Sequence, residues 1–156
     1  MLIPIRVATL AIALSFMTAA VCFAANPHIG TWKFNDAKSK IRPGVTRNST
    51  LIYSEQGDKI KATADATDEG GKPIRWIWVG KFDGKAYPVK GNPHHNAASY
   101  RIINDHTAFV QGFKDGKLMW WGTITISKDG KTRTAILQST DAKGKKFTVQ
   151  KVYDRA

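Results

Sequence analysis

The side chain best placed to do chemistry is a lysine that interrupts an apolar face. In the β-rich segment 147–154, Phe147, Val149, Lys151 and Tyr153 fall on one side if the strand alternates regularly. An unpaired lysine is costly to bury, so it must meet a carboxylate, reach solvent or face an anionic ligand. Two interpretations stay open. Either Lys151 extends to solvent or a bulge turns Val152 inward instead, or Lys151 offers a positive charge inside a cavity.

Aromatic rings are the second candidate group. The chain has five tryptophans, and Trp76, Trp78, Tyr100 and Trp120 fall on apolar faces of their segments. These rings could wall a cavity for a flat or apolar ligand. With Lys151 beside them, the ligand would be an amphipathic carboxylate. The alternative is that the rings simply fill the core, because the interior of a barrel of about eight strands is just wide enough for side chains.

Two adjacent histidines, His94 and His95, lie beside Pro93 in a loop-like stretch. A histidine pair could bind a metal or act as a base, but its immediate neighbours supply no carboxylate or third histidine. We therefore expect solvated loop histidines and no metal site. The single cysteine, Cys22, excludes a disulfide framework, and no Cys/His set has zinc spacing.

No sequence motif identifies a catalytic residue. The chain has no Gly-x-Ser-x-Gly, no paired-carboxylate pattern and no glycine-rich phosphate loop. We expect no cofactor and favour a non-enzymatic function. A small barrel isomerase or lyase stays an alternative, because catalytic groups can assemble from distant segments.

The elements that must position these side chains are short β-rich runs separated by turn residues. Asp-Gly-Lys occurs three times, and Asp-Gly suits the left-handed backbone of tight hairpin turns. Runs joined by short turns predict an all-β fold, an antiparallel up-and-down β-barrel of about eight to ten strands. Nine runs are expected, at 28–35, 50–54, 59–67, 74–81, 98–103, 107–113, 117–127, 132–140 and 147–154.

Between these runs, only residues 82–97 look like a long loop, since Pro88, Gly91 and Pro93 lie there. Alternation also predicts which side chains face the interior. Besides the rings and the last segment described above, the interior set is Ile74, Ala98, Ile102, Leu118, Ile124 and Ile126.

Residues 1–24 are predicted to be a secretory signal peptide. Arg6 precedes an apolar run, and Cys22-Phe23-Ala24 places small residues at the −3 and −1 positions of a cleavage site. Cleavage would leave 25–156 as a single domain in the periplasm or the medium, with no membrane span. A lipidated Cys22 is disfavoured by the branched Val21 before it.

The mature chain would be strongly basic. Without Arg6 it has 23 Lys and Arg against 12 Asp and Glu, a formal charge of +11. Attraction to envelope polyanions is one interpretation, and Lys143, Lys145 and Lys146 form a tight cluster. The dispersion of the other charges favours a solvated surface. Nucleic acid is not an expected partner, because the aromatic residues fall on interior faces.

The sequence resembles the lipocalins and related calycin barrels. Gly30-Thr31-Trp32 matches their opening Gly-x-Trp signature, and GTWKFNDAKSK (30–40), GKFDGKAYPVKGNP (80–93), SKDGKTRT (127–134) and KVYDR (151–155) look like small exported bacterial lipocalin-like proteins. The resemblance covers nearly all of 25–156. It implies a closed barrel in which Trp32, after Gly30, plugs one end and packs against a late arginine, for which Arg155 is the candidate. At 132 residues the chain is short for a lipocalin.

These observations lead to one functional hypothesis and two alternatives. The hypothesis is an exported, lipocalin-like barrel that binds a small apolar or amphipathic ligand, with Trp76, Trp78, Tyr100, Trp120 and Lys151 as the candidate binding residues. The alternatives are the barrel enzyme and a filled-core basic protein that acts on envelope polymers.

Overall fold

The computed structural model describes residues 25–156, and the predicted signal peptide and Cys22 lie outside that range. The described chain forms ten strands and no helix. The strands are β1 (Gly30–Phe34), β2 (Arg47–Gln56), β3 (Lys59–Thr67), β4 (Pro73–Gly80), β5 (Asp83–Lys90), β6 (Ala97–Asn104), β7 (Thr107–Lys114), β8 (Lys117–Ile126), β9 (Thr132–Thr140) and β10 (Lys146–Arg155).

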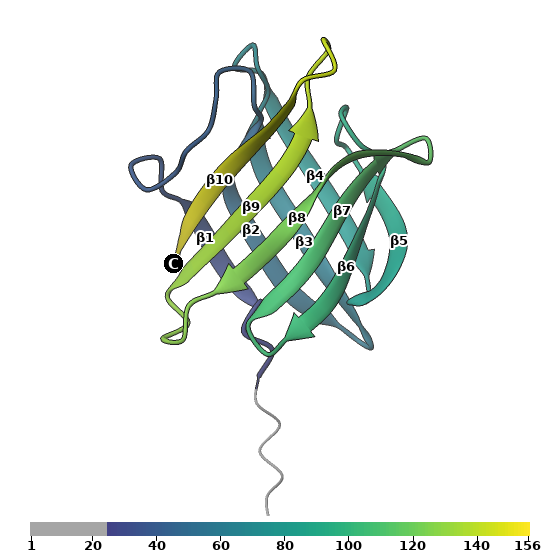
Figure 1. The fold of residues 1–156 in the computed structure, drawn as a ribbon. Helices are drawn as coiled ribbons and strands as arrows, with labels where there is room; N and C mark the ends of the chain where they lie inside the picture. The colour runs from purple at the N-terminus through teal and green to yellow at the C-terminus, as the bar shows by residue number, and fades with distance from the viewer. Residues whose placement is uncertain (1–24) are drawn as a thin grey trace, which may run out of the picture.

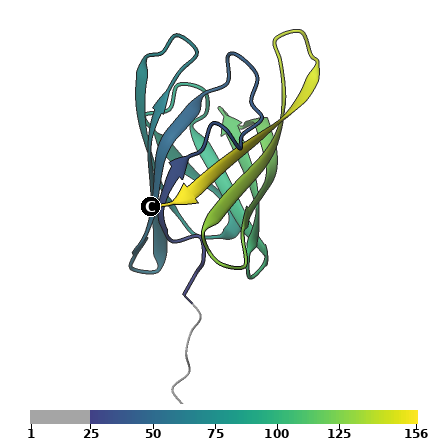
Figure 2. The same ribbon diagram turned by 90° about the vertical axis from the view of Figure 1, so that its left-hand side faces the viewer.

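Every strand pairs antiparallel with its neighbours in sequence, and β1 pairs with both β2 and β10, which closes the barrel. Figures 1 and 2 show the resulting up-and-down meander from two sides. Closure gives every strand a partner on both sides. The predicted all-β antiparallel barrel is confirmed, with ten strands.

The predicted loop at 82–97 is wrong, because half of it is strand β5. Only residues 91–96 remain as a loop between β5 and β6. The ladder is weak here: β4 and β5 pair only through Ile77↔Lys90 and Trp78↔Val89. Pro88 has no N–H to donate, and its partner in the β5–β6 ladder is Ala97, the first residue of β6. A strand that contains a proline and has so few ladder partners has the sequence features of a loop.

Trp32 lies at one end of the barrel, close to the segment that precedes β1. It is fully buried, and its Nε1 donates to the backbone oxygen of His28 at 3.1 Å. The Arg155 guanidinium lies 4.1 Å from the centre of the Trp32 ring and donates to the carbonyl oxygens of Ile29 (2.8 Å) and Pro27 (2.9 Å). Gly30, at φ +139°, leaves room for that guanidinium, because a Cβ there would collide with Arg155 Nη1. We call this the closed end.

Large rings near the closed end fill the interior. Phe82 stacks on Tyr100 with 4.9 Å between ring centres, and Trp78 lies 4.6 Å from the same ring. Trp78 is fully buried, and its Nε1 donates to the backbone oxygen of Ala98 at 3.0 Å. This part of the barrel matches the core-filling interpretation of the rings.

The opposite end, which carries residues 35–46 and 91–96 (Figure 1), is not filled in the same way. Toward this end the inward positions on β3 are alanines, with Ala64 opposite Trp76 and Ala66 opposite Ile74. The small side chain of Ala64 gives the Trp76 ring room to lie against the barrel wall. The alternation of small and large side chains therefore leaves space between the walls at this end, which we call the open end.

Two predicted interior residues are exposed, so these predictions are wrong. Leu118 is 42% exposed, and the β7–β8 register shifts between Gly112 and Phe113, next to it. Ile102 is 44% exposed and lies where the β6–β7 register shifts before Asn104. A bulge adds a residue to one strand and interrupts the alternation on which such predictions rest.

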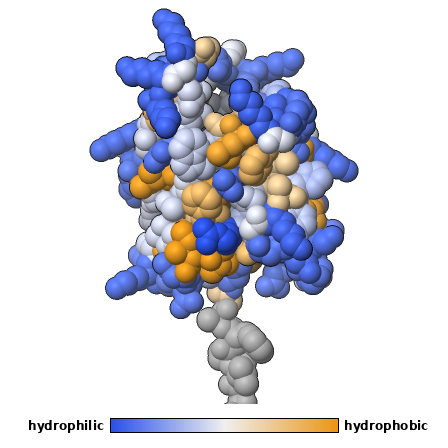
Figure 3. Space-filling view, turned by 45° about the vertical axis from the view of Figure 1, so that its right-hand side comes forward, coloured by the Kyte–Doolittle hydropathy of each residue, from blue (hydrophilic) through white to orange (hydrophobic). Residues whose placement is uncertain are grey.

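Hydrophilic side chains project from much of the outer surface. Figure 3 shows them on one face, interrupted by smaller apolar areas. Exposed apolar residues of the barrel include Ile52, Ile77 and Ile136. In the described part of the chain, no helix is long and apolar enough to cross a membrane.

Candidate functional site

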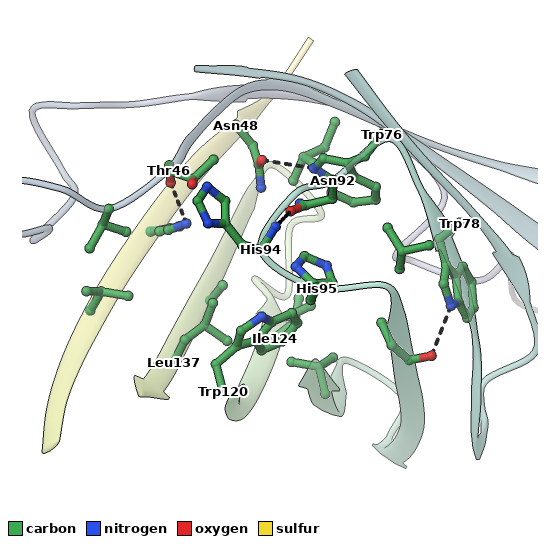
Figure 4. Close-up of a pocket in the computed structure, with 18 of the residues that line it drawn as sticks. Thr46, Asn48, Trp76, Trp78, Asn92, His94, His95, Trp120, Ile124 and Leu137 are labelled. Carbon is green, nitrogen blue, oxygen red and sulfur yellow. Dashed lines mark hydrogen bonds between the residues drawn. The ribbon is translucent and has the colours of Figure 1, made fainter. Parts of the chain in front are cut away.

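A cavity of about 190 Å³ lies inside the barrel toward the open end. Its lining combines inward side chains of the strands with Thr46 before β2 and with Asn92, His94 and His95 from the loop 91–96. Figure 4 shows these loop residues above the strand residues Trp120, Ile124 and Leu137. The cavity is thus walled by the sheet and bordered by two loops that meet at one end of the barrel.

All four rings proposed from the sequence, Trp76, Trp78, Tyr100 and Trp120, line this cavity. Trp76 is buried, and its Nε1 donates to Oδ1 of Asn48 at 3.2 Å, which fixes the plane of the indole. Trp120 lies against Gly112, where a Cβ would collide with the indole. Because Trp78 and Tyr100 also pack on Phe82, Trp76 and Trp120 are the rings nearest the open end.

Lys151 lies inside the barrel. The β9–β10 ladder runs from Lys146 to Asp154 without a register shift, so no bulge displaces it. The residue is only 8% exposed, and its Nζ donates to the backbone oxygen of Thr46 at 2.8 Å. Both solvent exposure and the bulge are therefore contradicted. Val152 is also buried, but outside the cavity lining, where its N–H donates to Oγ of Ser39.

Arg133 is a second buried cation in the cavity, and it is absent from the residues predicted from the sequence. It is 3% exposed, and its Nη2 donates to the Tyr53 hydroxyl at 2.9 Å. The guanidinium lies over the rings of Tyr53 (5.1 Å) and Tyr153 (5.3 Å). Among the described residues, its Nε has no hydrogen-bond partner. The alternation that singles out Lys151 could have found it, because Arg133 shares a face with Ala135 and Leu137.

In the described part of the chain, no carboxylate neutralises these two cations. The described lining residues include no Asp or Glu, and neither Arg133 nor Lys151 belongs to an ion pair within residues 25–156. Burial, and then the charge of Arg133, lowers the pKa of Lys151 to about 8. Burial raises the pKa of Tyr100 well above its ordinary value and that of Tyr153 to about 12. The cavity is therefore a positively charged site with neutral phenols.

His95 is buried, and the expectation of a solvated histidine is wrong for this residue. Its ring lies between Trp76 and Trp120, with 6.4 Å and 5.3 Å between ring centres (Figure 4). Burial, followed by repulsion from His94 and Lys151, lowers its pKa to about 4, so the imidazole is neutral at pH 7. The two tryptophans that bury it come from distant strands, which no local pattern reveals.

The rest of the loop is exposed, except for the half-buried Asn92, and hydrogen bonds hold it in place. His94 is exposed, and its backbone N–H donates to Oδ1 of Asn92 at 2.9 Å. Asn96 exchanges two hydrogen bonds with Asp115 of the β7–β8 turn, at 2.7 and 3.0 Å. Over residues 25–156, no three His, Cys, Asp or Glu side chains gather in a metal-binding group.

Fold and site together define an antiparallel ten-stranded barrel with a positively charged internal cavity. No protein-family model and no curated protein matches the sequence. A solved structure described as EF1p2_mFAP2b bound to DFHBI is similar, with a TM-score of 0.47 and 12% identity. The match covers 85% of this chain and 97% of that chain, and it is too distant to bear on function.

Proposed function

We propose that this chain is a lipocalin-like binding protein that takes a small amphipathic anion into its barrel. The anionic head, a carboxylate or a group of similar charge, lies between Arg133 and Lys151. The apolar body packs against Trp76 and Trp120. The observation that carries the proposal is the pair of buried cations in an apolar cavity, with no carboxylate partner among residues 25–156.

The energetics favour a ligand as the missing partner. Buried charges in proteins are ordinarily paired, because the desolvation of an unpaired ion costs several kcal/mol. Arg133 uses one of its donors on Tyr53, and Lys151 gives one hydrogen bond to Thr46. The remaining donors of both side chains are available to an anion, and charge-assisted hydrogen bonds are roughly twice as strong as neutral ones.

The cavity volume sets the size of the ligand. A dry apolar cavity of about 150 Å³ holds one benzene molecule. At about 190 Å³, this cavity suits one aromatic ring with a short carboxylate side chain, or a short acyl chain. The packing of Phe82, Trp78 and Tyr100 prevents a longer ligand from reaching the closed end.

Binding is tested by tryptophan fluorescence, because Trp76 and Trp120 line the cavity. Wild type is titrated with 3-phenylpropanoate, benzoate and hexanoate, beside K151M and the exposed-lysine control K117M. We expect saturable changes in wild type and K117M and at least tenfold weaker binding in K151M. An equal response in K151M would remove Lys151 from the site, and no response in any protein would contradict cavity binding.

Export of the chain is part of the proposal, supported by the signal-like sequence of residues 1–24. The mature product would begin at Ala25 and be recovered in the periplasm or the medium. The intact mass of the product tests this. A chain that retains residues 1–24, or carries a lipid on Cys22, would contradict it.

A further inference from the structure

We propose that Lys151 is also an amine nucleophile that captures small aldehydes as an imine inside the cavity. The inference uses the cavity described above, but it does not require that the cavity bind an anion. The cavity would then form a covalent bond to a ligand at Lys151, and small aldehydes would be its second class of ligand.

The surroundings of Nζ provide what a reactive amine needs. Among the described residues, its one hydrogen-bond partner is the Thr46 carbonyl oxygen, and no carboxylate holds it as an ion pair. The charged and titratable side chains that line the cavity are Arg133, His94, His95, Tyr53, Tyr100 and Tyr153. None of these described side chains is a carboxylate, so no acidic residue of the lining stabilises the ammonium form.

The protonation equilibrium of Lys151 also favours the reactive free amine. With its pKa lowered to about 8, about a quarter of Lys151 is the free amine at pH 7.5. A lysine at the ordinary value of 10.5 has about 0.1% free amine at the same pH. Desolvation of a lysine in an apolar pocket is a known route to an amine nucleophile.

The reaction is balanced without any other reagent. The Lys151 ammonium first gives one proton to solvent. The amine nitrogen then attacks the aldehyde carbon to form a carbinolamine, and the carbonyl oxygen leaves as water when the C=N bond forms. The products are a neutral imine, one water molecule and one released proton. The positive charge of Arg133 nearby favours the neutral imine over its protonated form.

The two cations together favour an aldehyde that also carries a carboxylate. Lys151 pairs with Ala135 and Tyr153 pairs with Arg133, so Lys151 and Arg133 are diagonal neighbours on the inner face. Diagonal neighbours in a sheet lie about 7–8 Å apart. An aromatic aldehyde with a carboxylate across the ring, such as 4-formylbenzoate, can place its carboxylate near Arg133 and its carbonyl carbon at Nζ.

Reductive trapping tests the inference on the full chain. The protein is incubated at pH 7.5 with 4-formylbenzoate or with benzaldehyde for set times, and imines are then reduced with borohydride, which also reduces neutral imines. Peptide mass mapping then gives the labelling of each lysine, with the exposed Lys117 as the internal control. We expect Lys151 to be labelled at least tenfold faster than Lys117, and faster by 4-formylbenzoate than by benzaldehyde. K151R, which keeps the charge, should lose this adduct.

Labelling of Lys151 no faster than that of Lys117 overturns the inference. The fluorescence titration with 3-phenylpropanoate separates this result from a failure of the proposed function. If wild type binds the carboxylate but Lys151 stays unlabelled, anion binding is supported and imine capture is contradicted. Rapid labelling of Lys151 without carboxylate binding supports imine capture and contradicts the proposed anion site.

Discussion

Arg133 on β9 and Lys151 on β10 occupy successive inward positions of one antiparallel ladder, with Tyr153 opposite Arg133 and Ala135 opposite Lys151. Both are buried, and each contributes to an interior without carboxylates among the described residues. Two like charges so placed destabilise the empty barrel, because each is desolvated and they repel one another. The same arrangement stabilises a bound anion, so binding and stability should respond in opposite directions to removal of either charge.

The first prediction follows from that opposition. K151M should raise the free energy of unfolding by about 1–3 kcal/mol at pH 7, because replacing buried charges with apolar side chains of similar volume is often stabilising. Urea denaturation of K151M and wild type measures the difference. The exposed-site variant K117M should leave the unfolding free energy within about 0.5 kcal/mol of wild type. A K151M protein less stable than wild type would contradict the assignment of Lys151 as an uncompensated buried charge.

The second prediction concerns acid stability. Burial, then the charges of Arg133 and His106, lowers the pKa of His28 to about 4, and His95 has a similar value. Both lie below the ordinary 6.5, so between pH 6.5 and 4 the unfolded chain binds more protons than the folded one. Stability should be fully present above pH 6.5 and fall as the pH drops toward 4, by up to about 3 kcal/mol for each histidine.

Denaturation midpoints measured from pH 7.5 to 4 test this prediction. H95Q, which cannot take up a proton in this range, should lose about half of the pH dependence. The exposed His94 supplies the control, because H94Q removes only the repulsion that adds to the burial of His95, so most of the wild-type pH dependence should remain. A wild-type midpoint that stays constant down to pH 4.5 would show that the two histidines are not buried in neutral form.

The third prediction concerns the closed end. W32A should cost about 3–5 kcal/mol of stability, because it removes a fully buried ring and leaves a cavity beside the Arg155 guanidinium. I52A, on the neighbouring strand at a residue that is 42% exposed, should cost about 1 kcal/mol. Urea denaturation compares the two variants. Similar losses for both would show that Trp32 does not anchor the barrel.

Most of the strands can be predicted from the sequence, because turn residues and alternation are local features of each segment. Asp-Gly turns and alternation define β7, β8, β9 and β10 almost to the residue. Strand β5 escapes prediction because Pro88 and the weak β4–β5 ladder resemble a loop. Leu118 and Ile102, which are predicted to face the interior, lie beside register shifts. Such shifts depend on the partner strand, so the sequence of one strand does not reveal them.

The site can be predicted only in part. Lys151 stands out because it interrupts an apolar alternation. Arg133 is less conspicuous, because it lies near the start of its strand, before the inward Ala135 and Leu137. In the sequence Thr132-Arg133-Thr134 resembles a solvated face, and the Tyr53 and Tyr153 rings that bury the guanidinium come from other strands. The burial of His95 is hidden for the same reason, since Trp76 and Trp120 are remote in the sequence.

Calorimetric titration of wild type with a matched pair, 3-phenylpropanoate and 3-phenylpropanol, tests the anion site itself. The two ligands share the ring and the chain and differ in the charged head. We expect the carboxylate to bind at least tenfold more tightly at low salt, and R133M to remove most of this preference. Equal affinity for the acid and the alcohol, or binding of neither, would contradict the assignment of Arg133 and Lys151 as an anion site.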